Sequence, residues 1–109
     1  MPDRTVIVAS RREELVAALS EAGFNVVGPV TTASMALILA AQAPAALALV
    51  DENLTGRRTG PELAAQLYET WGVRSVLLGE FADSEAAAPW AASARDAERL
   101  RAVLAVRRL

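Results

Sequence analysis

The residue best placed to do chemistry in this chain is Asp51. It ends an apolar run in the stretch ALALVDENLTGRRTGPEL, residues 46–63. A carboxylate at this point is either a nucleophile or an acceptor of hydrogen bonds from the loop that follows. The first role needs neighbouring groups, because a carboxylate alone does little to stabilise the charge that develops during group transfer. The groups around Asp51 therefore decide what it does.

Three residue types that usually assist a carboxylate are missing. The chain contains no cysteine and no histidine, and all eleven of its basic residues are arginines. It therefore lacks a thiolate nucleophile, the commonest general base, the commonest metal ligand and an amine for Schiff-base chemistry. We expect a protein that is not an enzyme and that holds no metal ion and no cofactor.

The composition indicates one compact domain spanning residues 1–109. Hydrophobic residues make up 53% of the chain and charged residues 22%, which suits a single core and argues against disorder. The net charge of −2 gives no basic surface for nucleic acid. We expect no nucleic-acid partner.

Targeting and membrane segments are not expected either. The N-terminal residues MPDRTVIVAS hold no long apolar run behind a basic region, unlike a signal peptide. Residues 22–50 carry no charge and are long enough to span a bilayer, but glycines, prolines and polar residues divide them into short pieces. A buried strand–helix–strand stretch explains them better, and we expect a cytoplasmic protein without a membrane partner.

Short β-branched or aliphatic runs alternate with helical patterns along the chain. The expected strands lie at 5–9, 25–28, 46–50 and 74–78, and the expected helices follow residue 10 and lie at 31–42, 61–71 and 95–108. Ser10 is expected to cap the first helix, with Glu13 completing a capping box. The alternation predicts a parallel sheet with helices on both faces and a functional crevice beyond the carboxyl ends of its strands. Residues 9–11, Asp51 and residues 79–80 should meet there.

Two stretches resemble a known family. LALVDENLTGRRTGPELA, residues 47–64, is similar to the phosphoacceptor strand, following loop and helix start of response-regulator receiver domains. EAGFNVVGPV, residues 21–30, is similar to their first-helix exit and second strand. The resemblance covers residue 5 to about residue 78 and the last helix. It implies an α/β, flavodoxin-like (CheY-like) doubly wound parallel sheet of about five strands.

The resemblance also implies what the site should contain. A competent receiver is phosphorylated on the aspartate that matches Asp51, beside a Mg²⁺ ion held by an acidic pair after the first strand. Here those positions are Ala9 and Ser10, followed by Arg11. A hydroxyl that contacts the phosphoryl group falls on Gly79, and the family's lysine has no counterpart. We expect a degenerate site at Ala9, Ser10 and Gly79, with Asp51 vestigial.

Other charged residues near this site have ordinary interpretations. Some acids could replace the lost metal ligands, but we interpret them as exposed helix and loop residues. These acids are Glu13, Glu14, Glu52 and Glu80. Several arginines flank the crevice, and we favour solvated loop charges over charge partners of Asp51 in the place of the metal. These arginines are Arg11, Arg12, Arg57 and Arg58.

The stretch before the last helix is shortened. Residues 79–93 are about fifteen in number, fewer than a helix, a strand and their turns need. The family's fourth helix and fifth strand are therefore expected to be abbreviated, which alters its usual signalling face. Trp90 is expected either to fill the resulting gap or to anchor a partner.

The helix expected at 31–42 is apolar on its outer side too. Its predicted inner stripe is Ala36, Leu37, Leu39 and Ala40. Met35, Ile38 and Ala41 lie on the opposite face, and a helix that is apolar all round has to be covered on both sides. We expect a protein–protein contact through this face, in a homodimer. Leu104 on the last helix belongs to a second candidate surface.

The predicted function is that of an atypical receiver, or pseudo-receiver. It is a non-enzymatic module of two-component or phosphorelay signalling that acts through protein contact, without Mg²⁺-dependent phosphorylation. Its partner is a signalling protein or a second copy of the chain. The alternative is a divergent receiver that is still phosphorylated on Asp51. An enzyme or small-ligand binder on the same fold has only fold analogy behind it.

Overall fold

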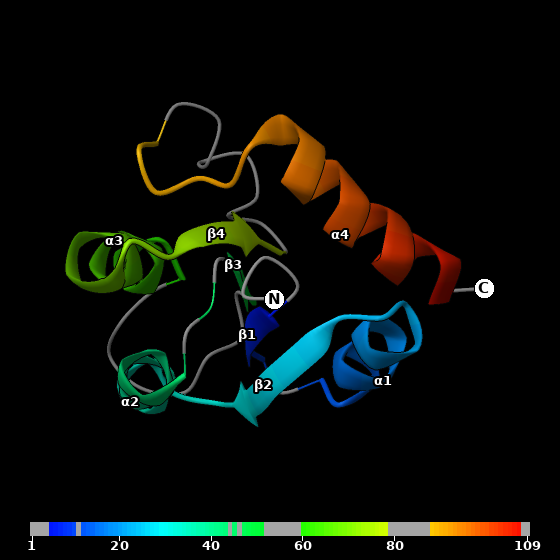
Figure 1. The fold of residues 1–109 in the computed structure, drawn as a ribbon, viewed down its shortest axis with the longest axis horizontal. Helices are drawn as coiled ribbons and strands as arrows, with labels where there is room; N and C mark the ends of the chain where they lie inside the picture. Colours follow the sequence, from blue (N-terminus) through cyan, green and yellow to red (C-terminus); the bar gives the residue numbers. More distant parts are fainter. Residues whose placement is uncertain are drawn as a thin grey trace.

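The computed structural model describes residues 5–10, 12–43, 45, 47–51, 60–78 and 88–107, with side chains as far as residue 103 in the last helix. Strands and helices alternate through this part of the chain, as predicted (Figure 1). In chain order the elements are β1 (Thr5–Ala9), α1 (Glu14–Glu21), β2 (Asn25–Val30), α2 (Ala33–Gln42), β3 (Leu47–Val50), α3 (Gly60–Trp71), β4 (Arg74–Leu77) and α4 (Ala94–Arg107).

The strands form one parallel sheet in the order β2-β1-β3-β4. β1 pairs with β3 residue for residue as far as Ala9 and Val50, and Val50 in turn lies opposite Leu77 of β4. In Figure 1, α1 and α4 cover one face of the sheet, and α2 and α3 cover the other. This is an α/β fold with helices on both faces of the sheet, and its strand order is compatible with a flavodoxin-like fold.

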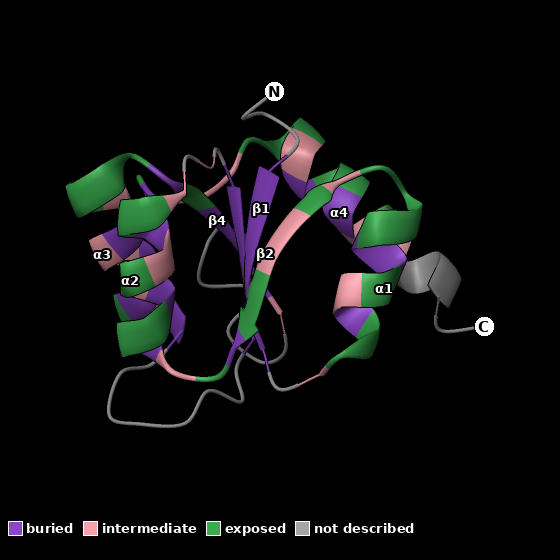
Figure 2. Cartoon of the chain, turned by 60° about the horizontal axis from the view of Figure 1, so that its bottom comes forward, coloured by how far each residue is buried: buried purple, intermediate pink, exposed green. Residues whose placement is uncertain are grey.

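Each face of the sheet has its own core. β1 and β3 are buried along their whole length, because their residues are apolar on both sides (Figure 2). Val6, Val8 and Leu49 belong to the core under α1 and α4, whereas Ile7 and Val50 belong to the core under α2 and α3. β2 lies at the end of the strand order, and most of its residues are partly or fully exposed.

α2 begins and ends where its sequence predicts. Thr32 caps it, since the Thr32 Oγ1 atom accepts a hydrogen bond from the Met35 amide at 3.2 Å. Its buried residues are Ala33, Ala36 and Ala40. Leu37 and Leu39, which we predict to belong to the inner stripe, are only half-buried. At 100° per residue these two leucines lie on opposite margins of the alanine stripe.

Beyond β4 the expected fifth strand is reduced, in the described residues, to one parallel bridge between Ser75 and Ala91. The Ser75 amide donates to the Trp90 carbonyl at 2.9 Å, and the Ala92 amide donates to the Ser75 carbonyl at 3.0 Å. The described part of the sheet therefore has four strands, where we predict about five. Most of the shortened segment, residues 79–87, lies outside the described residues.

Trp90 fills space beside this bridge. Its side chain is buried, with 8% of its surface exposed, and it belongs to the core under α2 and α3. This burial favours the alternative in which Trp90 fills a gap over the one in which it anchors a partner.

Two arginines secure the β4 edge where a full fifth strand would pair. Arg74 donates from one guanidinium nitrogen to the carbonyls of Pro89 and Ala91, at 3.1 and 3.3 Å. Arg101 of α4 donates to the Leu77 carbonyl at 3.2 Å. Arg74 thus links β4 to the segment that would form the fifth strand, and Arg101 satisfies a carbonyl on the β4 edge that a single bridge leaves open.

The uncharged stretch at residues 22–50 is divided as predicted, because it folds as β2, α2 and β3. α2 has 10 residues, about half of the roughly 20 that a membrane span needs. Among the described helices, none combines the length and apolarity required to cross a bilayer.

An irregularity in β2 depends on Gly28. Between Ile7 and Ala9, β2 holds one more residue than β1, so that Ala9 lies opposite Val30. Gly28 has φ +114°, and a Cβ atom built on it lies 2.8 Å from the Val8 carbonyl oxygen. Only glycine fits this backbone, which approaches β1 closely and has a positive φ.

We predict that Gly28→Ala lowers the free energy of unfolding by about 2–4 kcal/mol, because it adds a backbone clash to a strained φ. Gly72→Ala is the matched control, since Gly72 also has positive φ, at +71°, but a Cβ there meets no atom within 4 Å. The control should lose only about 1 kcal/mol. Urea denaturation of both variants measures the difference, and equal losses would contradict the close approach at Gly28.

Candidate functional site

The carboxyl ends of neighbouring strands are joined by backbone hydrogen bonds at one edge of the sheet. The Asp51 amide donates to the Ala9 carbonyl at 2.9 Å, which extends the β1–β3 pairing by one residue. The Ser10 amide donates to the Val30 carbonyl at 2.9 Å, which ties the end of β1 to the end of β2. Ser10 and Asp51 are therefore held side by side, as the predicted crevice requires.

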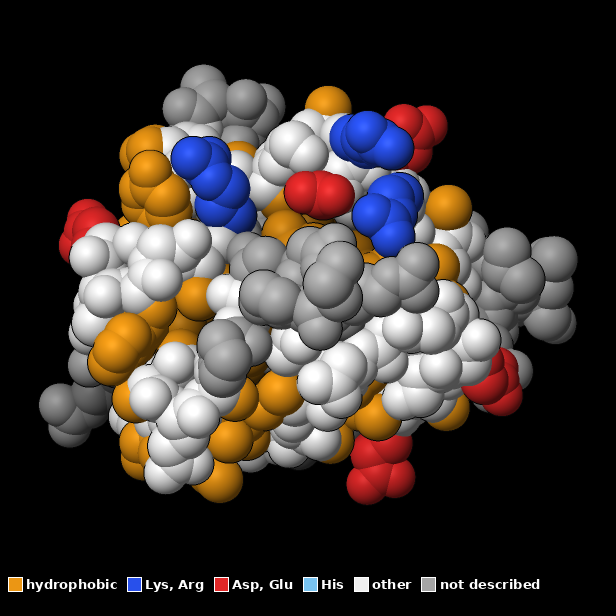
Figure 3. All heavy atoms as spheres, in the orientation of Figure 1, with side chains coloured by type: hydrophobic (Ala, Val, Ile, Leu, Met, Phe, Trp, Pro, Cys, Tyr) orange, Lys and Arg blue, Asp and Glu red, His pale blue; other side chains and the backbone are white. Residues whose placement is uncertain are grey.

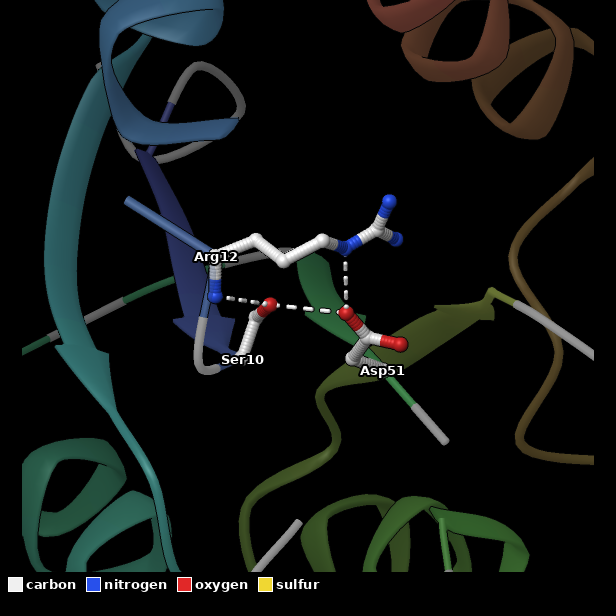
Figure 4. A network of polar contacts seen from close by, with 3 residues as sticks. All are labelled: Ser10, Arg12 and Asp51. Atoms are coloured by element: carbon white, nitrogen blue, oxygen red, sulfur yellow. Dashed lines mark hydrogen bonds and ion pairs between the residues drawn. The ribbon is translucent and has the colours of Figure 1, made fainter. Parts of the chain in front are cut away.

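Three side chains form a polar cluster at this edge (Figure 4). The Ser10 hydroxyl donates to Asp51 Oδ2 at 2.8 Å. Arg12 Nε donates to the same oxygen, also at 2.8 Å, and forms an ion pair with it. The Ser10 Oγ atom accepts a hydrogen bond from the Arg12 amide at 3.0 Å, which fixes the turn that carries the arginine. In Figure 4 the Arg12 side chain reaches from the segment after β1 across to Asp51 at the end of β3.

The burial of the two charged partners is unequal. The Asp51 side chain is 2% exposed, whereas the Arg12 side chain is 40% exposed. A buried carboxylate needs hydrogen bonds or a cation, and this one has both. Arg12 bonds the buried acid through its Nε atom, while part of its side chain is exposed to water. The cluster is therefore a structural ion pair at the boundary between core and solvent.

Two sequence predictions fail at this cluster. Arg12 is not a solvated loop charge, because it bonds directly to Asp51; the charge-partner alternative is the one observed. Ser10 does not build a capping box, since α1 has Glu13 at its N-cap and no side chain bonds there. The reason is competition: the Ser10 hydroxyl donates its hydrogen bond to the buried Asp51 carboxylate, and its oxygen accepts one from the Arg12 amide.

The other predicted site positions differ in where the structure places them. Ala9 is fully buried in the core under α2 and α3, so it brings only its backbone carbonyl to Asp51. Glu13 and Glu14 are exposed, as predicted. The remaining predicted positions lie outside the described residues; they are Arg11, Glu52, Arg57, Arg58, Gly79 and Glu80.

The geometry limits what Asp51 can do chemically. Its Oδ2 atom accepts hydrogen bonds from both a hydroxyl and a guanidinium. Nucleophilic attack or metal binding by that oxygen would require these bonds to lengthen or break. Within the described part of the chain, no group of three or more acidic, cysteine or histidine side chains lies together as a metal ion would need.

A second candidate surface lies on the outer side of α2. Met35 and Ile38 are 51% and 56% exposed, and Ala41 is exposed as well. Figure 3 shows hydrophobic side chains reaching the surface on the side of the molecule where α2 lies in Figure 1. In the single chain this apolar face is therefore exposed, and the predicted contact through it stays a prediction. The side chain of Leu104, the second surface candidate, lies outside the described residues.

No protein-family model matches the sequence, and no curated protein matches it. The features of the described residues that bear on function are the geometry of the Asp51 cluster and the surface of α2.

The sequence predicts Ser10 only as a helix cap and as the position of a lost acid, and not as a donor to Asp51. The signal that could have revealed its role is the spacing Ser10-x-Arg12 directly after β1, the strand that neighbours β3. A hydroxyl and a cation at this spacing can both reach a carboxylate that ends the neighbouring parallel strand.

We predict opposite effects for two buried serines. Ser10→Ala removes the hydroxyl from Asp51 and should lower the free energy of unfolding by about 1.5–3 kcal/mol. Ser75→Ala should raise it by about 1 kcal/mol, because the Ser75 Oγ atom is buried with no hydrogen-bond partner among the described residues. Chemical denaturation measures both changes. A Ser10→Ala variant as stable as the wild type would show that the Ser10 hydroxyl contributes nothing, and a loss in Ser75→Ala would contradict the prediction for Ser75.

We predict that Arg12→Met lowers the free energy of unfolding by about 1–3 kcal/mol, since it removes the cation from a buried carboxylate while partial exposure softens the loss. Asp51→Asn should lower the free energy of unfolding by less than Arg12→Met does, because the arginine that loses its partner can rotate into the solvent. The double variant should be more stable than the sum of the two losses implies. An additive double-mutant cycle would mean that the ion pair carries no energy.

Proposed function

We propose that this chain is a receiver-like signalling module that holds a permanent ion pair in place of a phosphorylation site, and that acts through protein contact. Asp51 is then a structural carboxylate, and no Mg²⁺-dependent phosphoryl transfer takes place on it. The observation that carries the proposal is the 2.8 Å contact between Arg12 Nε and Asp51 Oδ2. The resemblance of residues 47–64 to a phosphoacceptor strand and loop supports the receiver-like origin.

Charge explains why this ion pair and a metal site exclude each other. Mg²⁺ requires oxygen ligands at about 2.1 Å in an octahedral arrangement. A guanidinium bonded to the same carboxylate oxygen repels a dication, since even two single charges about 4 Å apart interact by about 4 kcal/mol near a protein surface. The positions of the lost acidic pair supply a methyl group that is buried in the core and a hydroxyl that is already bonded.

The protein-contact part of the proposal is supported by α2. An uncharged helix that exposes half or more of Met35 and Ile38 leaves apolar surface in water unless another molecule covers it. A receiver-like domain without a phosphorylation switch can still act by constitutive binding. Such a domain functions through the surface that it exposes for binding, and not through a phosphorylation-dependent change of conformation.

The alternative is a divergent receiver that is phosphorylated on Asp51 with Arg12 as its cation. It requires Asp51 Oδ2 to give up the Ser10 or the Arg12 bond before that oxygen can bind a metal ion or react. This alternative makes a different prediction for metal and phosphoryl analogues, so one experiment separates the two functions.

We predict that Mg²⁺ followed by beryllofluoride, a mimic of an acyl phosphate, leaves the amide NMR spectrum of the wild-type chain unchanged around residues 10, 51 and 79. Asp51→Ala serves as the reference for non-specific shifts. Shifts that appear in the wild type and vanish in Asp51→Ala would establish the phosphorylatable alternative instead.

A gain-of-function variant shows that the measurement can detect a site. Ser10→Asp combined with Arg12→Ala replaces the bonded hydroxyl with a second carboxylate and removes the repelling cation. We expect this variant to gain Mg²⁺-dependent shifts near residues 10 and 51, because paired carboxylates are suitable ligands for the ion. If it gains none while remaining folded, the ion pair is not what excludes the metal.

A further inference from the structure

We propose that the outer face of α2 binds a second copy of this chain, in an antiparallel helix pair whose two-fold axis passes beside Ile38. The inference rests on the proposed function, in which the module acts through protein contact, and it names the partner and the geometry. It comes from the pattern of exposed residues on α2, from the charge around the helix and from the irregularity in β2.

The exposed residues of α2 are symmetric about Ile38. They are Ser34, Met35, Ile38, Ala41 and Gln42. A two-fold axis beside Ile38 places Ile38 against its own copy, Met35 against Ala41 of the second copy, and Ser34 against Gln42. The large Met35 side chain then meets the small Ala41, each polar side chain meets a polar one, and the two Ile38 side chains meet at the axis. A surface that maps onto itself in this way is what an isologous dimer requires.

The charge around α2 suits a second copy better than a charged partner. Residues 22–50, which include both β2 and α2, contain no charged residue. Two identical charged surfaces would repel each other across a two-fold axis, but two neutral apolar surfaces do not. A partner that is recognised through charge would find no complementary group on this helix. Because α2 carries no charge, it offers little to a charged partner, but it can pack against α2 of a second copy without repulsion.

The exposed edge of β2 is a less suitable place for two copies to meet. β2 ends the strand order, and an unpaired edge can accept a strand from another chain. Here Gly28 and Pro29 interrupt it: the bulge shifts the register, and proline has no amide hydrogen to donate. The helix face is therefore the surface of this uncharged region that is left for a symmetric contact.

The size of the helix sets the expected strength. A ten-residue helix is about 15 Å long, which buries less than the roughly 800 Å² per partner of a standard interface. Trp71, 45% exposed, is a further apolar side chain at the end of α3, the helix that packs beside α2. We therefore expect a dimer that dissociates on dilution through the micromolar range.

Single-cysteine cross-linking tests the position of the axis, because the natural chain has no cysteine. Ile38→Cys places two thiols at the axis, within reach of a short bis-maleimide, whereas Ala17→Cys places its thiol on the exposed side of α1. Thiols held in a dimer react at an effective concentration near millimolar, so Ile38→Cys should cross-link roughly 100-fold faster than the control at micromolar protein. Equal rates would overturn the proposal.

A size swap tests the pairing of Met35 with Ala41. Met35→Ala and Ala41→Met should each weaken the dimer roughly tenfold, the first by loss of contact and the second by overpacking. The double variant exchanges large for small on both copies and should recover to within about threefold of the wild type. Sedimentation equilibrium measures the three dissociation constants. A double variant as weak as the sum of the singles would rule out this axis.

The proposed function and this inference fail separately. A wild-type chain that remains monomeric at the highest soluble concentration overturns the dimer, yet an inert Asp51 in the NMR titration would still support a non-phosphorylated module with an unlike partner. Conversely, a dimer cross-linked at residue 38 whose Asp51 takes up beryllofluoride would overturn the proposed function and leave the dimer standing.

Discussion

The parallel pairing of β1 with β3 is the constraint on which the candidate site depends. It brings Ala9 level with Val50, so the next residue on each strand, Ser10 and Asp51, emerges at the same edge. The Asp51 amide continues the ladder by donating to the Ala9 carbonyl, which draws its side chain into the buried end of the sheet. A carboxylate held there needs partners, and the turn after β1 is the nearest segment that can provide them.

The charges of one carboxylate and one arginine cancel, whereas three neighbouring carboxylates need a metal ion to neutralise their charge. When an acidic pair is absent, a single buried acid would be left with one negative charge, and Arg12 neutralises it without a ligand from solution. The hydroxyl of Ser10 completes the solvation of the same oxygen. The site can thus be stable in the free protein, because it depends on no ion or phosphoryl group to compensate the buried charge.

Arginine also compensates for the abbreviated sheet. Arg74 of β4 bonds the carbonyls of Pro89 and Ala91, and Arg101 bonds the Leu77 carbonyl of β4, where the described residues form only one bridge to Ala91. The guanidinium fork suits this task because it presents several donors in a plane. Charged side chains lie on α1, α3 and α4 and in the Asp51 cluster, whereas β2 and α2 carry none. The surface of β2 and α2 therefore differs from the rest of the domain in the forces that it offers to a partner.

The sequence by itself determined the order of strands and helices, the buried faces of β1 and β3 and the exposed apolar face of α2, because periodicity and turn residues are local properties. It also excluded thiol, imidazole and amine chemistry by composition. Only the tertiary structure decided that Arg12 bonds Asp51, that Ser10 is a hydrogen-bond donor rather than a helix cap, and that Trp90 belongs to the core. Each of these contacts joins residues tens of positions apart, and their choice among competing partners depends on which strand ends the sheet places side by side.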